Sequence, residues 1–357
     1  MRNLYIDIGS TNIKYCLEKQ KINAVLFPLP LVNTNNKYEV EISKITDIIL
    51  EIIKKNDAEN IYFSVQMHGY ILSDANHKPL TNYISWRDSR FLSYKNEAPF
   101  KIKPESGTSL KKNTPAASML TIYEENKQLF EKVRYFDSLG SYLFYYLTNN
   151  HYIHLSDACP TGFYMLDGKT NNDVMDYYIF KNILFPKATG DLKFSCKYKN
   201  KNIFIPIGDN QASAMGSAID DNSYLLNTGT TSQMCAISNK LIKDGVENRW
   251  YIDNKYLLTI NFLPGGMDVR PEKIISVKEK YIEAIKKMPK RDKIIIAGGL
   301  SLYKNECLNI FKELNLEVKT IDKVSTIEGL KIIAKGEWLW NTNLELWLVK
   351  YLFHHFL

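Results

Sequence analysis

Two turns of one chemical type, far apart in the chain, constrain its fold more than any other feature. The first spans residues 7–11 and reads Asp-Ile-Gly-Ser-Thr, and the second spans residues 227–231 and reads Asn-Thr-Gly-Thr-Thr. An apolar run precedes the first turn, and apolar and polar residues alternate after it, as in a half-buried strand. Each turn therefore joins two strand-like runs. The repetition predicts a duplicated α/β fold in which each half contributes one such turn.

The order of helical and strand-like segments favours two lobes. Isoleucines recur at three- and four-residue spacing over residues 42–53, which predicts an amphipathic helix, and residues 61–65 are typical of a buried strand. A second cycle begins with a strand-like run at 203–207, followed by a helix of small residues. We expect two domains, residues 1–205 and 206–357, because the chain is long enough for two cores.

Four further segments complete the expected organisation. Residues 278–288 show helical amphipathicity, and residues 293–297 are strand-like. Residues 186–202 are basic and indicate a loop. Residues 338–357 contain three of the five tryptophans and are unusually apolar. This last segment fits a packed terminal helix or an atypical end equally well.

Composition limits the classes of function. The formal net charge of +7 comes from scattered lysines and arginines, which argues against nucleic acid as a partner. No apolar stretch reaches the roughly 18 residues that span a bilayer, so we expect no membrane association. The five cysteines are far apart and form no metal-binding or disulfide pattern. Together with the absence of a signal-like start, they predict a cytoplasmic protein.

The two turns can bind phosphate. Gly9 lets backbone amides approach an anion, and hydroxyls such as those of Ser10 and Thr11 can donate to its oxygens. Asp7 can hold a magnesium ion through water, and Lys14 can reach the same phosphates as a point charge. A plain hairpin is the better reading of the first turn alone. The second turn, with its Gly229, Thr230 and Thr231, makes the phosphate reading the stronger one.

Two short motifs have the polar groups that a sugar requires. Gln66-Met67-His68-Gly69 follows a strand directly, and ligands of α/β sheets bind at such strand ends. Trp86-Arg87-Asp88 offers a flat apolar platform beside a fork of donors and a carboxylate acceptor. For the first motif, the alternative is that His68 has only a structural role. For the second motif, the alternative is a surface salt-bridge cluster at the start of a helix.

A third motif can supply a base. Asp209 follows a strand and opens a helix, a position from which a carboxylate can take the proton of an attacking hydroxyl. Helix capping by Asp209 or Asn210 is the alternative, and both roles are compatible. Gly298 and Gly299 follow another strand and can let the chain pass flat against an adenine or a ribose.

These segments resemble the FGGY family of carbohydrate kinases, which has the actin-like ATPase (ribonuclease H-like) fold, with two lobes and a cleft between them. The match rests on residues 5–14, 64–69, 79–90 and 207–211, in the family's order and with similar spacing. The resemblance covers residues 1–237 well and 290–340 loosely. The segment at 64–69 is most similar to the ketose branch, the xylulokinases and sedoheptulokinases.

The resemblance implies ATP-dependent phosphorylation of a small sugar, with a pentulose or heptulose as the first candidate, and ATP and Mg²⁺ as cofactors. It implies that Asp209 is the catalytic base and, with Asp7, a metal ligand. The implied sugar contacts are Gln66, Met67, His68, Trp86, Arg87, Asp88 and Asn210. The implied nucleotide contacts are Gly9, Ser10, Thr11, Lys14, Gly229, Thr230, Thr231, Gly298 and Gly299.

One departure from the family pattern concerns the nucleotide side. The stretch at 239–291 is too short for the usual helical insertions of the second lobe, which puts nucleotide preference and oligomeric state in doubt. A catalytically degenerate sugar-binding or regulatory protein is one alternative, and an actin-like ATPase acting on a non-sugar substrate is another. Retention of Asp7 and Asp209 argues against the first, and the two sugar motifs argue against the second.

Overall fold

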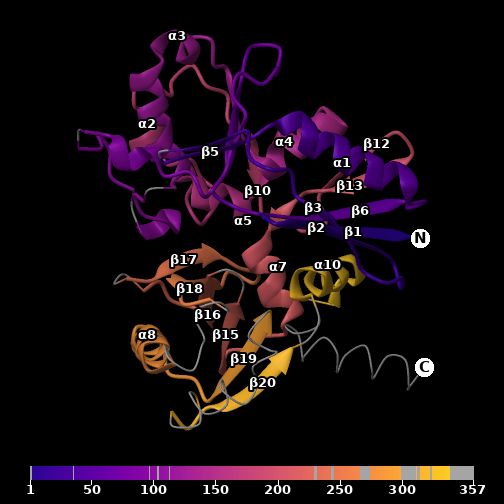
Figure 1. The fold of residues 1–357 in the computed structure, drawn as a ribbon, viewed down its shortest axis with the longest axis vertical. Helices are drawn as coiled ribbons and strands as arrows, with labels where there is room; N and C mark the ends of the chain where they lie inside the picture. The colour runs from indigo at the N-terminus through magenta and orange to yellow at the C-terminus, as the bar shows by residue number, and fades with distance from the viewer. Residues whose placement is uncertain are drawn as a thin grey trace, which may run out of the picture.

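The computed structural model of the chain has two lobes, each with its own β-sheet (Figure 1). It describes residues 2–34, 36–95, 97–102, 104–111, 113–228, 231–242, 245–265, 274–298, 311, 314–321 and 324–337. The predicted α/β class and the predicted two lobes are confirmed. The predicted apolar tail at 338–357 lies outside the described residues.

A seven-stranded sheet forms the centre of the first lobe. Its main path runs β12-β13-β6-β1-β2-β3, and β14 pairs with β6. The strands are β1 (Asn3–Ile8), β2 (Asn12–Leu17), β3 (Asn23–Leu26), β6 (Asn60–Val65), β12 (Ser195–Tyr198), β13 (Lys201–Phe204) and β14 (Ile207–Gly208). The predicted hairpin is β1–β2, which closes with Ile8 opposite Ile13. β1 is parallel to β6, so the turn after β1 and the segment after β6 lie at one edge of the sheet.

Helices cover both faces of this sheet. The predicted isoleucine stripe belongs to α1 (Ile42–Lys55), which packs with α4 (Leu139–Thr148) against one face. Helix α10 (Ser325–Lys335) lies against β1 and β6 on the other face, where Ile327 and Leu330 meet Tyr5 and Tyr62. Since α10 also packs on α7 (Asp209–Gly216), these two helices connect the lobes.

A smaller subdomain extends from the first lobe. Its five-stranded sheet has the order β4-β5-β8-β7-β9, and a two-stranded sheet, β10-β11, lies nearby. The strands are β4 (Val32–Thr34), β5 (Lys37–Val40), β7 (Tyr70–Ser73), β8 (Tyr83–Ile84), β9 (Tyr135–Ser138), β10 (Tyr152–His154) and β11 (Lys187–Thr189). The helices are α2 (Pro115–Glu125), α3 (Lys127–Phe130), α5 (Leu155–Ala158) and α6 (Asn172–Met175), with short 3-10 turns at Arg90–Ser93, Pro104–Ser106 and Cys159–Thr161.

The second lobe is built on a six-stranded sheet of order β17-β18-β16-β15-β19-β20. Its strands are β15 (Ser223–Thr228), β16 (Ser232–Ser238), β17 (Glu247–Trp250), β18 (Tyr256–Leu263), β19 (Lys293–Gly298) and β20 (Glu317–Ile321). Helix α8 (Ile274–Lys286) packs on one face, where Tyr281 is fully buried beside Phe311. β15 and β16 form a hairpin like that of β1 and β2, so the second turn has the place in its sheet that the first turn has in its own.

Two expectations from the sequence are wrong in detail. Residues 186–202 are not a loop, because β11 and β12 lie within them and β13 begins there. The strand expected at 203–207 is divided between β13 and β14. The helix of small residues expected after it is α7, which begins at Asp209 and ends at Gly216. Within the described ranges, no helix has the length and apolarity needed to cross a membrane.

Candidate active site

A cavity of about 250 Å³ lies between the two lobes, where the two predicted turns face each other. It brings together seven residues predicted from the sequence, namely Ser10, Gln66, Met67, His68, Trp86, Asp209 and Thr231. Asn227 and Thr228 also line it and belong to the second predicted turn. Six residues that the sequence did not indicate complete the wall, namely Lys111, Asn113, Gln233, Arg249, Asn261 and Phe262. Both lobes therefore contribute to one site.

Gln66 has the clearest signature of a ligand contact. It directly follows the buried strand β6, and its backbone N–H donates to Ile8 O at 3.1 Å. The side chain is 3% exposed, yet neither its amide nitrogen nor its amide oxygen has a hydrogen-bond partner among the described residues. An unpaired buried amide costs roughly 1–3 kcal/mol. The side chain is thus arranged for a polar ligand.

His68 adds a neutral imidazole to the same wall. Its φ of +64° lies in the left-handed region, which is unusual for a residue other than glycine and is typical of functional sites. Burial lowers the pKa of His68 well below its usual value, and the positive charges of Arg249 and Lys111 lower it further. A neutral ring can both accept and donate a hydrogen bond, as a sugar hydroxyl requires. The neighbouring Gly69 has no room for a side chain, because a Cβ would lie 2.1 Å from Tyr83 Oη.

The structure separates the members of the Trp86-Arg87-Asp88 motif. Trp86 lines the cavity. Arg87 lies over the Trp86 ring and donates to Ser10 Oγ at 3.1 Å, so it supports two cavity residues from behind. The Asp88 carboxylate is 2% exposed and accepts from Arg90 and from Tyr38 N. Asp88 is therefore engaged in the fold and does not line the cavity.

Asp209 has the electrostatics of a general base. It is the first residue of α7 and lines the cavity. Burial raises the pKa of Asp209 to about 7, and the negative charge of Asp7 adds to the effect, whereas Arg249 opposes it. A carboxyl group with a pKa near the working pH is well suited to accept a proton from a hydroxyl group.

The carboxylates of Asp7, which is buried, and Asp209, which is half-buried, interact electrostatically and fit a divalent cation. Asp7 is 5% exposed and accepts a hydrogen bond from Ser64 Oγ at 2.5 Å. Burial also raises the pKa of Asp7, while Ser64 and Lys14 lower it. Two carboxylates that repel each other in a cleft lose that repulsion when a hard cation such as Mg²⁺ binds through oxygen. Lys14 lies opposite Asp7 on β2, which explains its effect on this pKa.

The predicted phosphate residues are only partly gathered at the cavity. Ser10 and Thr231 line it, whereas Gly9, Thr11 and Lys14 do not. Gly9 closes the hairpin, with its N–H donating to Asn12 O at 3.1 Å. Gly298, at the end of β19, has a φ of +87° and packs so closely on β15 that a Cβ would lie 2.0 Å from Thr228 O. The predictions for Gly229, Thr230 and Gly299 fall outside the described residues.

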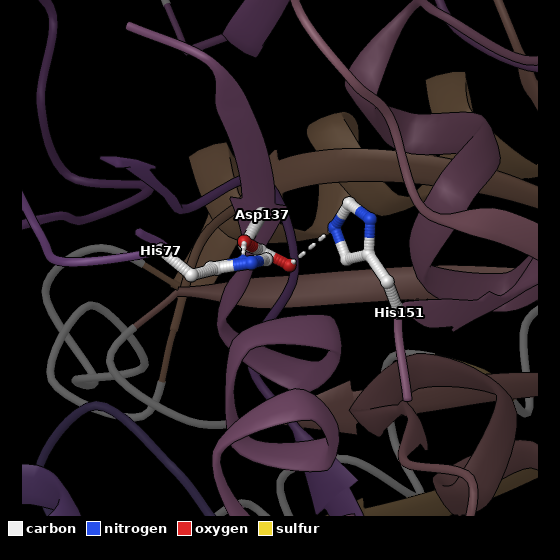
Figure 2. A group of neighbouring side chains, drawn as sticks. All are labelled: His77, Asp137 and His151. Carbon is white, nitrogen blue, oxygen red and sulfur yellow. Dashed lines mark hydrogen bonds and ion pairs between the residues drawn. The ribbon is translucent and has the colours of Figure 1, made fainter. Parts of the chain in front are cut away.

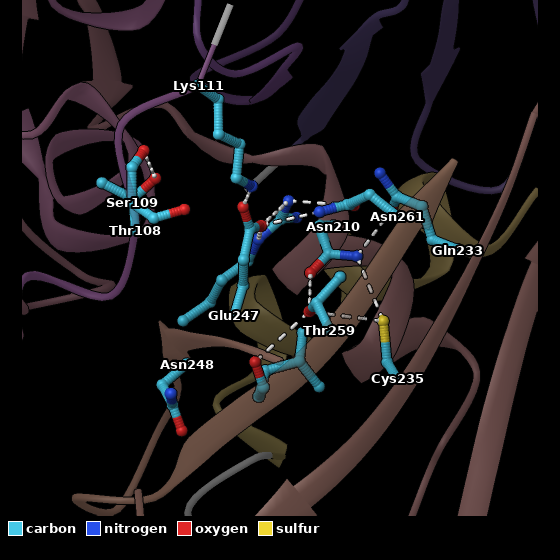
Figure 3. Close-up of polar contacts among 12 residues, drawn as sticks. Thr108, Ser109, Lys111, Asn210, Gln233, Cys235, Glu247, Asn248, Thr259 and Asn261 are labelled. Atoms are coloured by element: carbon cyan, nitrogen blue, oxygen red, sulfur yellow. Dashed lines mark hydrogen bonds and ion pairs between the residues drawn. The ribbon is translucent and has the colours of Figure 1, made fainter. Parts of the chain in front are cut away.

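Asn210 does not line the cavity and instead contacts a residue that does. Its Nδ2 donates to Gln233 Oε1 at 2.9 Å and to Cys235 Sγ at 3.4 Å (Figure 3). Because Gln233 lines the cavity, Asn210 fixes a cavity residue of β16 from the first turn of α7. The structure therefore places Asn210 where it positions Gln233, and its side chain does not reach the cavity wall.

Two basic residues complete the wall, and burial, together with the charge of Arg249, lowers the pKa of Lys111 to about 7. The Arg249 side chain is 2% exposed, its Nη2 donates to Glu247 Oε2 at 2.9 Å, and its Nη1 has no partner among the described residues. The Lys111 Nζ comes from the other lobe and contacts the same Glu247 carboxylate (Figure 3). No local motif marks either residue. For Arg249, the only signal in the sequence is that it lies two residues after another charged residue, Glu247, on the short strand β17.

The fold and the site define a two-lobed, actin-like protein with a carboxylate-bearing cleft. Residues 30–200 match the family described as "FGGY family of carbohydrate kinases, N-terminal domain". Over these 171 of 357 residues the chain is similar to the N-terminal domain of the FGGY carbohydrate kinases, the family that its sequence motifs resemble.

Curated relatives and solved structures agree with this assignment. A gluconokinase of Bacillus subtilis (strain 168) is 28% identical over 185 residues, which are 46% of this chain and 35% of that protein. A xylulose kinase of Staphylococcus xylosus is 24% identical over 263 residues, which are 67% of this chain and 54% of that protein. The chain thus spans only about a third to a half of these relatives.

Among solved structures, a ligand-bound xylulose kinase from Lactobacillus acidophilus superimposes with a TM-score of 0.83 at 18% identity, covering 96% of this chain and 91% of that one. A gluconate kinase from Lactobacillus acidophilus gives a TM-score of 0.79, also at 18% identity, covering 95% and 90%. At this level of identity the likeness establishes the fold.

Proposed function

We propose that the protein phosphorylates a hydroxyl group of a small sugar with ATP, and that Asp209 is the base. The observation that carries the proposal is that one cavity holds Asp209, with its raised pKa, and Gln66, with its unpaired buried amide. Ser10 and Thr231 reach the same cavity from the two turns. A base, a polar pocket and donors for phosphate are the parts that in-line phosphoryl transfer needs.

The proposed reaction divides the work between the lobes. Gln66 and His68 orient the acceptor, Trp86 packs against its C–H groups, and Asp209 takes the proton of the attacking oxygen. The hydroxyls of Ser10 and Thr231 donate to the transferred phosphoryl group, whose charge is stabilised by donors already in place. Mg²⁺, held through Asp7 and Asp209, would neutralise phosphate charge. Such a reaction uses the ATP and magnesium of the cytoplasm, the location that the sequence predicts.

A ketose is the first candidate acceptor, because the segment at 64–69 resembles that branch of the family. A sugar acid is the second candidate. Arg249 and Lys111 place two cations on the acceptor wall and share a single carboxylate, Glu247, which suits an anionic group on the substrate. One curated relative is named a gluconokinase and another a xylulose kinase, and they represent these two classes.

The test is ADP release from Mg·ATP in the presence of pentuloses, heptuloses, aldoses, gluconate and glycerol. We expect one class to stimulate turnover, and we expect Asp209→Asn to lower kcat by roughly 10²–10⁴-fold, the range for loss of a general base. Asp221→Asn, which removes a carboxylate from an exposed ion pair with Lys255, is the matched control and should leave kcat unchanged. No stimulation by any acceptor would favour a degenerate sugar-binding protein. Turnover of ATP without an acceptor would favour an ATPase with a non-sugar substrate.

A further inference from the structure

A second group of functional side chains lies in the smaller subdomain, and none of its three members lines the active-site cavity (Figure 2). His77 comes from the turn between β7 and β8, Asp137 from β9, and His151 from the segment between α4 and β10. Their potential ligand atoms all lie within 4.8 Å of one another. Three segments that are distant in the chain thus bring two imidazoles and a carboxylate to one point.

We propose that His77, Asp137 and His151 bind one transition-metal ion of the Zn²⁺ class and that this ion ties the three segments together. The two oxygens of Asp137 face different rings: Oδ2 lies 2.7 Å from His77 Nε2, and Oδ1 lies 3.1 Å from His151 Nε2. In Figure 2 the carboxylate lies between the two histidines. An ion in this space has two nitrogens and a carboxylate as ligands, a common set for zinc.

The surroundings hold the ligands in place, as the outer shell of a metal site does. The His77 ring is stacked between Tyr135 and Tyr145, with centroid distances of 3.9 and 3.6 Å. Ser141 Oγ donates to Asp137 Oδ1 at 2.8 Å and so fixes the carboxylate. Because neither His77 nor Asp137 can turn away, an entering ion meets ligands that are already oriented.

Burial and access also suit an ion. The side chains of His77 and Asp137 are 3% and 0% exposed, whereas that of His151 is 18% exposed. A fully buried carboxylate needs a positive partner, and a metal ion supplies one without an additional side chain. The partial exposure of His151 makes this ligand accessible from the solvent.

The donor set selects the kind of ion. Imidazole nitrogen suits Zn²⁺, Co²⁺ and Ni²⁺, whereas Mg²⁺ and Ca²⁺ prefer oxygen ligands. The site therefore differs chemically from the Asp7–Asp209 pair, and its ion would not be the magnesium of the reaction. Coordination uses the lone pair of each Nε2, so protons bound there leave as the ion enters.

The experiment measures Zn²⁺ per chain by mass spectrometry after EDTA treatment, reloading and gel filtration, without an affinity tag. We expect one ion per wild-type chain. His151→Gln and Asp137→Asn should weaken Zn²⁺ binding at least about tenfold. Co²⁺ in place of Zn²⁺ should give visible d–d absorption in the wild type that His151→Gln abolishes. Zinc should also raise the Tm of the wild type and leave that of His151→Gln unchanged.

A double variant, His354→Gln/His355→Gln, is the control, because these two histidines are adjacent in the sequence and could bind zinc independently of the proposed site. It should bind zinc as the wild type does. Zinc well below one ion per chain in the wild type, full binding by a folded His151→Gln protein, or loss of binding in the double variant would each overturn the proposal. Circular dichroism of each variant distinguishes lost binding from lost folding. His151→Gln is the safer variant, because His151 is partly exposed.

Discussion

At the scale of single residues, Asp209 sets how the proposed reaction should depend on pH. Its pKa is raised to about 7 by burial and by the charge of Asp7. Only the ionised form can act as a base, so kcat/KM should fall about tenfold per unit as the pH decreases below 7. A pH profile from 5.5 to 8.5, recorded with excess coupling enzyme, measures this. A rate that stays constant down to pH 5.5 would contradict Asp209 as the titrating base.

The same raised pKa means that ionised Asp209 costs stability. The folded-state pKa lies about three units above that of an ordinary aspartate, so the protonated form favours folding, and this contribution is lost as the pH rises through about 7. Asp209→Asn should therefore raise the free energy of unfolding at pH 8, by up to about 4 kcal/mol, at 1.36 kcal/mol per unit. The gain should shrink toward pH 4. Urea titrations at both pH values measure it, and a variant that is less stable than the wild type at pH 8 would disprove it.

Sequence motifs predict a site residue where that residue comes directly after a strand. Gln66 and Asp209 each follow a strand directly, so the position of the strand places the side chain at the cavity. Asp88 has similar chemistry, but Arg90 engages its carboxylate within the fold. Arg249 and Lys111 reach the cavity because tertiary structure joins two lobes at Glu247. No local pattern contains that information.

At the scale of elements, the crossing of α7 and α10 depends on two glycines. A Cβ at Gly216 would lie 1.8 Å from Ser325 O, and a Cβ at Gly329 would lie 1.9 Å from Ala212 O. Gly→Ala normally favours a helix by about 1 kcal/mol, but here the added methyl group meets backbone. Gly329→Ala should therefore lower the free energy of unfolding by roughly 1–3 kcal/mol.

Chemical denaturation tests the crossing directly. The control is Lys335→Ala at an exposed site of the same helix, which should change stability by less than about 0.5 kcal/mol. Gly329→Ala should also slow the reaction, because α10 carries Thr326, whose hydrogen bond lowers the pKa of Asp7. A Gly329→Ala protein as stable as the wild type would show that α7 and α10 can move apart without a loss in the free energy of unfolding.

The elements that sequence reasoning found and missed differ in how they are stabilised. α1 was predictable because its isoleucine stripe is local and regular. The strands β11 and β12 were missed because their lysines and polar residues indicate a loop. β12 is held by pairing with β13, and β13 by pairing with β6, far away in the sequence. For such edge strands, the partner outweighs the local propensity.

At the scale of the whole molecule, the two lobes meet around the cavity. Gly107 of the first lobe packs so closely that a Cβ would lie 2.3 Å from Asn248 O of β17, and Lys111 contacts Glu247 on the same strand. The cavity, whose wall includes Lys111 and Arg249, is therefore complete only when these segments are together. We propose that the chain divides near residue 205, so that closure of two units assembles the site, as in enzymes whose lobes exclude water.

Lys111 allows this assembly to be tested. Lys111→Gln removes a positive charge that one lobe contributes to a pocket shared by both. If the acceptor is a sugar acid, its KM should rise about tenfold, or about 1.4 kcal/mol, and the effect of salt on KM should weaken. If it is a ketose, KM should change less than about threefold. Lys169→Gln, at an exposed ion pair with Asp167, is the control. A sugar acid whose KM is the same with Lys111→Gln as with the wild type would show that Lys111 does not face the acceptor. The size of the effect therefore assigns the substrate class as well as the role of the interlobe contact.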